Sequence, residues 1–175
     1  MTPTKKLPLF VVTGASCAGK STACETLFRR EKDYIVLESD ILWNAFYDTP
    51  QDGYALYRHT WMELRANVSQ CGLPCVLCGC GTPEQFEPRP ERAFFSDIHY
   101  LAVVCDDATM LRRMKEGRGV TDEGWIDSSV QFNRWLWENA GTTTPPITLL
   151  DTSALTPEEA GDAIDRWIRS RLSAL

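Results

Sequence analysis

The sequence has little histidine, no long apolar run and no block of basic residues. The two histidines, His59 and His99, stand near no acid or nucleophile pattern, so we interpret both as structural. No apolar stretch approaches the roughly 18 residues that a transmembrane helix needs. The short apolar run after residues 1–6 predicts a first strand rather than a signal peptide. We therefore expect a cytoplasmic protein that does not bind membranes.

Positive charge is also scarce, because 18 Lys and Arg residues stand against 24 Asp and Glu residues. The resulting net charge of −6 provides no broad basic surface of the kind that binds duplex nucleic acid. An anionic ligand would have to be held by a few local arginines.

The seven cysteines do not predict a metal site or a disulfide framework. Four of them fall close together, but the segment Cys75–Gly79 is typical of a buried strand, in which cysteine behaves as a small apolar residue. The side chains of a single strand are poorly placed to supply the four ligands of a zinc site. The odd number of cysteines also argues against a disulfide framework.

The most informative segment is GASCAGKS, which matches the phosphate-binding pattern G-x-x-x-x-G-K-[ST]. It follows the apolar run Leu7–Val12 and precedes a helical pattern over Ser21–Arg30, whose N-terminal dipole favours an anion. In this motif the lysine reaches the β- and γ-phosphates and the hydroxyl of Ser21 binds Mg²⁺. The segment therefore predicts that ATP and Mg²⁺ are bound by Gly14, Ala15, Ser16, Cys17, Ala18, Gly19, Lys20, Ser21 and Thr22.

Two motifs of other nucleotide-binding classes are missing. The apolar run Cys75–Gly81 ends without the acidic residue that closes the corresponding strand of many P-loop ATPases, which counts against a motor or a GTPase. No guanine-specifying Asn/Thr-Lys-x-Asp pattern occurs, which favours ATP as the nucleotide.

Strand-like runs alternate with helical patterns along the whole chain, which predicts an α/β fold with a parallel sheet. Residues 81–90 and 116–124 break this alternation and are predicted to be irregular loops. No repeat or linker divides the sequence, so residues 1–175 are predicted to form one domain. The five expected strands are Leu7–Val12, Tyr34–Leu37, Cys75–Cys78, His99–Cys105 and Ile147–Leu150.

Asp40 is the candidate catalytic carboxylate. It lies just beyond the second expected strand, twenty positions after Lys20. A kinase needs a group that accepts the proton of the attacking hydroxyl or holds Mg²⁺ through water, and a carboxylate there can do either. The alternative is that Asp40 caps the helical segment 41–47, and the two roles are compatible.

With these residues in place, the chain resembles the P-loop kinases of the nucleoside/nucleotide-kinase-like superfamily, such as shikimate and gluconate kinases and chloramphenicol phosphotransferase. The resemblance implies a three-layer α/β/α sandwich with five parallel strands in the order 2-3-1-4-5. It also implies that Asp40 contacts the acceptor hydroxyl and that the loop containing Ser153 packs near the adenine. An arginine-rich lid around residues 110–126 would bring Arg112, Arg113 and Arg118 to the nucleotide, with Arg113 and Arg118 acting in catalysis. The alternative for these arginines is a solvated basic helix end.

The acceptor pocket is predicted from residues on two helical segments. Trp43, Asn44 and Tyr47 follow the second strand closely, and Arg58 and Arg65 share one face of a later helix. An aromatic platform with an arginine pair suits a planar or anionic acceptor. Trp43 and Tyr47 are also four residues apart, so both can instead belong to the core.

The sequence thus predicts an ATP-dependent kinase, a monomer or homodimer, that phosphorylates a hydroxyl or phosphate of a small molecule, including nucleosides, nucleotides or antibiotics. A second hypothesis is an ATP-binding regulatory module, in which Trp125, Trp135 and Trp137 form part of a protein interface. A third is a polynucleotide 5′-kinase, which needs a basic groove for a single strand and is disfavoured by the acidic charge.

Overall fold

The computed structural model describes residues 6–29, 33–46 and 50–173. Its sheet has five strands that pair in parallel in the order β2-β3-β1-β4-β5. The apolar runs form strands because an inner strand of a parallel sheet is covered on both faces and needs no polar alternation; every residue of β1 and β3 is buried. The strands are β1 (Leu9–Thr13), β2 (Ile35–Glu38), β3 (Cys75–Cys78), β4 (Ile98–Val104) and β5 (Ile147–Asp151).

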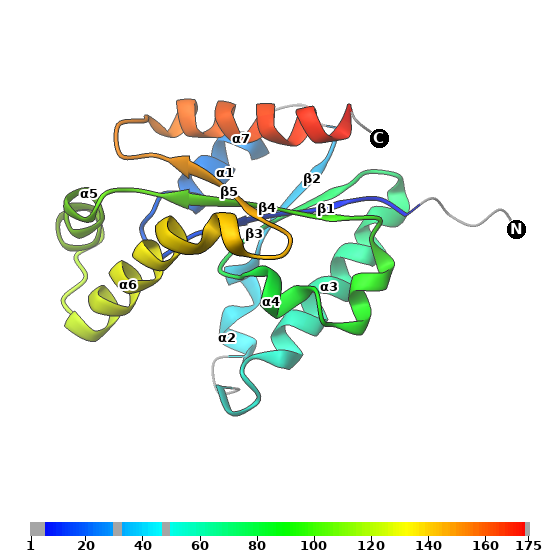
Figure 1. Cartoon of the computed structure of the whole chain (residues 1–175), viewed down its shortest axis with the longest axis horizontal. Helices are drawn as coiled ribbons and strands as arrows, with labels where there is room; N and C mark the ends of the chain where they lie inside the picture. The colour runs from blue at the N-terminus through cyan, green and yellow to red at the C-terminus, as the bar shows by residue number, and fades with distance from the viewer. Residues whose placement is uncertain (1–5, 30–32, 47–49, 174–175) are drawn as a thin grey trace, which may run out of the picture.

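Helices cover both faces of this sheet (Figure 1). Helices α1 and α7 lie on one face, and α2, α3 and α4 lie on the other, with α6 beside the β4–β5 edge. This arrangement confirms the predicted three-layer fold and strand order. The helices are α1 (Lys20–Phe28), α2 (Trp43–Phe46), α3 (Ala55–Val68), α4 (Pro83–Phe86), α5 (Asp107–Arg112), α6 (Glu123–Asn139) and α7 (Pro157–Leu172).

The last helix begins where its local sequence indicates. Thr156 and Glu159 form a capping box at the start of α7, with Pro157 as the first helical residue. The helix then buries Ile164 and Ile168 against α1 and the sheet. Within the described residues, no helix is both long enough and apolar enough to cross a lipid bilayer.

The segment after β3 differs from the predicted irregular loop. It contains α4, which begins with a capping box between Thr82 and Gln85, and a 3₁₀ turn over Pro90–Phe94. Pro83 and Pro90 each occupy the start of their helical piece, where proline costs no hydrogen bond. Two of the three prolines in residues 81–90 therefore begin helical pieces.

Candidate functional site

The phosphate-binding motif forms the turn between β1 and α1. Gly14 has φ +148°, and a Cβ atom there would lie 2.4 Å from the carbonyl oxygen of Val103 on β4, so the turn requires glycine. Gly19 is the N-cap of α1. The first four N–H groups of an α-helix have no partner inside the helix, so those of α1 are presented to this turn. The backbone geometry therefore fits a bound phosphate.

Some of the predicted nucleotide-binding residues present their side chains to a cavity, and others do not. Ser16, Cys17, Lys20, Ser21 and Thr22 line a cavity in front of the turn. The Lys20 ammonium donates a hydrogen bond to the carbonyl oxygen of residue 15, at 2.8 Å, and so lies across the turn. The methyl groups of both alanines in the motif are buried, so these two residues can offer a ligand only their backbone.

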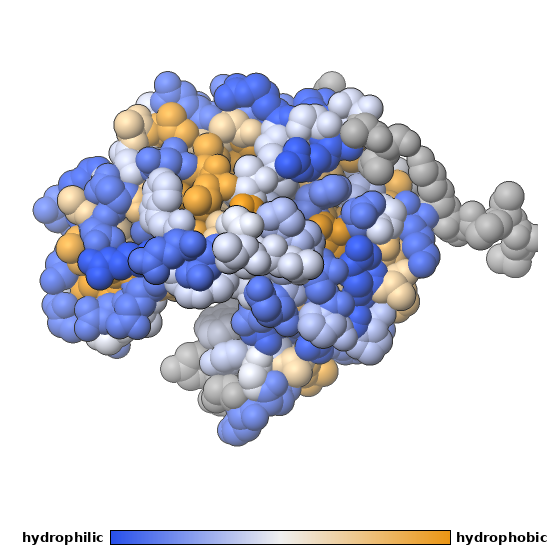
Figure 2. Space-filling view, in the orientation of Figure 1, coloured by the Kyte–Doolittle hydropathy of each residue, from blue (hydrophilic) through white to orange (hydrophobic). Residues whose placement is uncertain are grey.

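The cavity has a volume of about 1320 Å³. Pockets for one small ligand usually measure about 300–1,000 Å³, so there is room for a nucleotide and a second molecule. The outline of the molecule is indented between the lobe that carries α5 and the start of α6 and the projection that carries α2 and the start of α3 (Figure 2). Residues from both of these parts line the cavity.

Asp40, the predicted catalytic carboxylate, lines this cavity. It is exposed within the 3₁₀ turn Ser39–Leu42 that follows β2, and it accepts a 3.4 Å hydrogen bond from the Ser39 hydroxyl. The end of β3 approaches this turn so closely that a Cβ atom on Gly79 would lie 2.0 Å from Ser39 Oγ. Because Gly79 has no side chain, it leaves room at the end of β3 for the turn that carries Asp40.

Three aromatic rings form a wall next to Asp40, which we call the aromatic wall: Trp43, Tyr54 and Tyr57. The centroid of the Trp43 ring lies 5.1 Å from that of Tyr54 and 5.5 Å from that of Tyr57. The Tyr57 hydroxyl donates a 2.9 Å hydrogen bond to the carbonyl of Ser39, and burial raises the pKa of this phenol. The aromatic wall is thus anchored to the turn that carries Asp40.

Of the other predicted acceptor residues, Asn44 and Arg58 line the cavity. Arg58 donates a hydrogen bond to the carbonyl of Gly53, and partial burial lowers the pKa of its guanidinium. Tyr47 lies outside the described residues.

Arg65 does not reach the cavity, which corrects the predicted arginine pair. Its side chain is fully buried, with the guanidinium 4.7 Å from the centroid of the Trp61 ring and Nη2 donating to the carbonyl of Leu37 on β2. Burial lowers the pKa of this guanidinium to about 10. Arg65 packs beneath the strand that leads to Asp40, because α3 passes from the cavity into the core between positions 58 and 65.

The predicted lid contains a turn of π-helix over Arg113–Gly117, between α5 and α6. Arg112, Arg113 and Arg118 all line the cavity. Arg113 is committed to the protein itself: Nη1 donates to the carbonyl of Ala18 at 2.8 Å and to Thr152 Oγ1 at 3.1 Å, and Nη2 donates to the carbonyl of Thr152 at 2.8 Å. This arginine fastens the lid base to the phosphate turn and to the loop after β5.

Trp125, which the sequence suggested as an interface residue, lies inside the site. It lines the cavity, and its indole N–H donates a 3.2 Å hydrogen bond to the hydroxyl of Ser16 in the phosphate turn. The guanidinium of Arg118 lies 5.4 Å from the centroid of the Trp125 ring. Ser16, Trp125 and Arg118 thus form a bridge from the phosphate turn to the lid.

The loop after β5 reaches the cavity through residues other than Ser153. The Ser153 hydroxyl donates to Asp151 at 2.6 Å and accepts from the backbone N–H of Asp106 at 2.8 Å, and Ser153 is not among the residues that line the cavity. Its neighbours Thr152 and Leu155 line the cavity instead. The residues that this loop contributes to the cavity wall are therefore Thr152 and Leu155 rather than the predicted Ser153.

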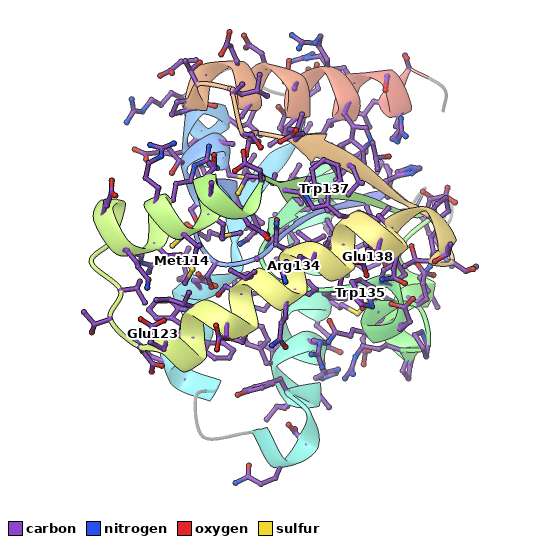
Figure 3. The ribbon with its side chains drawn as sticks, turned by 60° about the vertical axis from the view of Figure 1, so that its left-hand side comes forward. Met114, Glu123, Arg134, Trp135, Trp137 and Glu138 are labelled. Atoms are coloured by element: carbon purple, nitrogen blue, oxygen red, sulfur yellow. The ribbon has the colours of Figure 1, made fainter. Side chains whose placement is uncertain are left out.

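The other two tryptophans named by the sequence lie away from the cavity. Trp135 and Trp137 flank opposite sides of α6 (Figure 3), and 36% and 42% of their surfaces are exposed. Trp135 stacks on Phe132, and the indole N–H of Trp137 donates to the carbonyl of Cys105 at 3.3 Å.

The oxygen donors of the site suit Mg²⁺. Ser21 supplies a hydroxyl and Asp40 a carboxylate on the wall of the same cavity, and magnesium usually takes one or two carboxylates together with substrate phosphates and water. Elsewhere in the described part of the chain, no group of three or more His, Cys, Asp or Glu side chains is placed to hold a metal ion. The cysteines of the described residues, including Cys75 and Cys78, are free thiols.

The bridge leads to a testable expectation. Trp125→Phe removes the indole N–H and Ser16→Ala removes its acceptor, and each should lower kcat/KM for ATP about 2- to 10-fold, the usual range for one neutral hydrogen bond. The double variant should be no worse than either single variant, because one contact is lost in all three. Trp135→Phe, which changes a comparably exposed tryptophan on the same helix, is the control. If the losses in kcat/KM of the two single variants multiply in the double variant, Ser16 and Trp125 do not act through one shared contact.

Comparison with known proteins places this geometry in a known fold. No protein-family model matches the chain, and no curated protein matches its sequence. A gluconokinase from Sinorhizobium meliloti has a TM-score of 0.61 and 14% identity, over 96% of this chain and 99% of that chain. The tunicamycin resistance protein of Deinococcus radiodurans has a TM-score of 0.65 and 15% identity, over 93% of this chain and 96% of that chain.

Shikimate kinase from Acinetobacter baumannii in complex with shikimate is also similar, with a TM-score of 0.57 and 15% identity over 94% of each chain. At these identities the likeness is one of fold. The chain therefore has the fold of P-loop small-molecule kinases.

Proposed function

We propose that this protein is an ATP-dependent kinase that transfers the γ-phosphate of MgATP to a hydroxyl group of a small molecule. The observation that carries the proposal is a single cavity that is lined both by the phosphate turn with Lys20 and by Asp40 with the aromatic wall. Such a cavity holds donor and acceptor side by side, which is the main requirement of phosphoryl transfer.

Each residue has a defined role in this proposal. The backbone of the phosphate turn and Lys20 hold the phosphates, Ser21 supplies an oxygen ligand to Mg²⁺, and Asp40 contacts the same ion through water. Asp40 orients the acceptor hydroxyl and accepts its proton. Arg112 and Arg118 bring positive charge to the transferred group. The bound MgATP supplies the phosphoryl group and a metal ion that neutralises developing charge.

Arg113 has a supporting role, because its three hydrogen bonds fix Ala18 and Thr152 and thereby the shape of the nucleotide end. We propose that it positions the site rather than touching the transferred phosphate. We further propose that Thr152 and Leu155 lie along the bound nucleotide.

The test is acceptor-dependent ADP formation by the purified protein with MgATP and a panel of nucleosides, nucleotides, sugars and antibiotics. The expected result is that at least one acceptor raises the rate of ADP formation tenfold or more over the rate with water alone. A rate that no acceptor raises would contradict the kinase proposal.

The regulatory-module hypothesis receives less support. Of the three tryptophans that suggested it, Trp125 lines the cavity and contacts the phosphate turn, which suits a role in nucleotide handling. A switch module also has no need for a second compartment beside its nucleotide, whereas this cavity exceeds the size of a usual single-ligand pocket.

A further inference from the structure

The charges that line the cavity are divided unevenly between its two ends. The nucleotide end carries Lys20 together with the three lid arginines. The part of the wall formed by the end of β2, the turn after it and helices α2 and α3, which we call the acceptor end, carries two carboxylates, Glu38 and Asp40, and among its described residues that line the cavity Arg58 is the one cation. The end that faces the acceptor is therefore not built to attract an anion.

The single positive charge of Arg58 does not balance the negative charges of both carboxylates. Part of its guanidinium is committed to the carbonyl of Gly53. Burial and the nearby positive charge of Arg89 both lower the pKa of its guanidinium, which still carries its single charge at neutral pH. Arg65, which would complete an arginine pair, is buried beneath β2. A carboxylate or phosphate on the acceptor would meet one partly committed arginine and two like charges.

The remaining surface of the acceptor end is aromatic and hydrogen bonding. Trp43 and Tyr54 pack with an interplanar angle of 37°, and Tyr57 stands at 88° to Trp43. The amide of Asn44 lies beside them on the cavity wall. Aromatic faces of this kind bind the planar face of a base or the apolar face of a sugar ring, and neither needs charge.

We infer that the acceptor is an uncharged, hydroxylated ring compound, a nucleoside or a free sugar, whose ring stacks on Trp43 and Tyr54 while a hydroxyl faces Asp40. This inference rests on the proposed function. In the transfer, the acceptor O–H bond breaks and its oxygen bonds to the γ-phosphorus of MgATP. The bond from that phosphorus to the bridging oxygen breaks, its electron pair leaves with ADP, and the proton passes to Asp40.

The experiment uses acceptors in pairs that differ by one anionic group and keep the same ring: adenosine with AMP, uridine with UMP, glucose with glucuronate, and galactose with galacturonate. Phosphorylation is followed by ADP formation, and binding is followed by calorimetry in the presence of a non-hydrolysable ATP analogue. The uncharged member of at least one pair should have the higher kcat/KM by tenfold or more. The nucleoside and sugar pairs identify which ring is used.

Matched variants test the stacking contact itself. Trp43→Ala should raise KM for the preferred acceptor about tenfold and leave KM for ATP unchanged, because loss of a stacked ring usually costs 5-fold to 100-fold in affinity. Trp43→Phe should recover most of this loss, and Trp137→Ala, which removes a more exposed ring outside the cavity, should have no effect on either KM.

The outcomes separate the two proposals. The proposal of an uncharged ring acceptor is overturned if the anionic members are preferred, or if Trp43→Ala leaves KM for the acceptor unchanged. The kinase proposal stands in both cases. Binding of uncharged ring compounds that depends on Trp43, without any phosphorylation, supports the acceptor class and contradicts the kinase proposal. If no ring compound binds and none is phosphorylated, both proposals are overturned.

Discussion

Replacing Lys20 by methionine is expected to reduce phosphate transfer about 1,000-fold or more. The ammonium of Lys20 already lies across the phosphate turn, 2.8 Å from the carbonyl oxygen of Ala15, so its charge is held where the β- and γ-phosphates would bind. Removing one preorganised donor of this kind typically costs 100- to 1,000-fold in kcat, and here a full positive charge is lost as well. The measurement is kcat/KM for ATP with the best acceptor, together with the dissociation constant of an ATP analogue.

The control for this variant is Lys6→Met, which removes the same charge from an exposed position before β1. It should behave as the unmodified protein in both measurements. Thermal unfolding of all three proteins checks that Lys20→Met is folded. A folded Lys20→Met variant with activity within fivefold of the unmodified protein would contradict the nucleotide site.

Changing Asp40 to asparagine should lower kcat by about 100- to 10,000-fold, the range observed for loss of a general base. The amide keeps the shape of the side chain in its exposed position beside the cavity but cannot accept the proton. Because Asp40 stands at the acceptor end, affinity for a nucleotide analogue without Mg²⁺ should be unchanged.

Asp97→Asn serves as the matched control, since this exposed carboxylate precedes β4 and does not line the cavity. Steady-state rates and nucleotide binding are measured on both variants. Full turnover in the Asp40 variant would exclude Asp40 as the catalytic base, and a loss of nucleotide affinity equal to the loss of rate would reassign it to nucleotide binding.

The fold and the phosphate turn were predictable because both depend on local sequence. The motif around Gly14 and Lys20 is contiguous, and the buried strands are continuous apolar runs whose positions shift by only one or two residues in the structure. The capping box at Thr156 likewise involves side chains three residues apart. Such signals need no knowledge of the tertiary structure.

The parts of the site that were missed depend on contacts between distant segments. Helical spacing correctly places Arg58 and Arg65 on one face of α3, but it does not indicate that this face runs from the cavity into the core. The Trp125 indole meets Ser16 across 109 positions of sequence, and no local pattern signals that contact. The sequence therefore grouped Trp125 with Trp135 and Trp137 in the hypothesis of a protein interface.

The three hydrogen bonds of Arg113 also define the mechanics of the lid. They join the end of α5 to Ala18 and Thr152, so this end moves with the sheet as one body. In the proposed kinase, the pivot of a lid motion would then lie beyond Arg113 and the buried Met114, toward Gly117, where the π-helical turn ends. The moving arm would consequently be short and would begin close to the proposed phosphate site, so that a small rotation would carry Arg118 away from a bound nucleotide and let ADP leave.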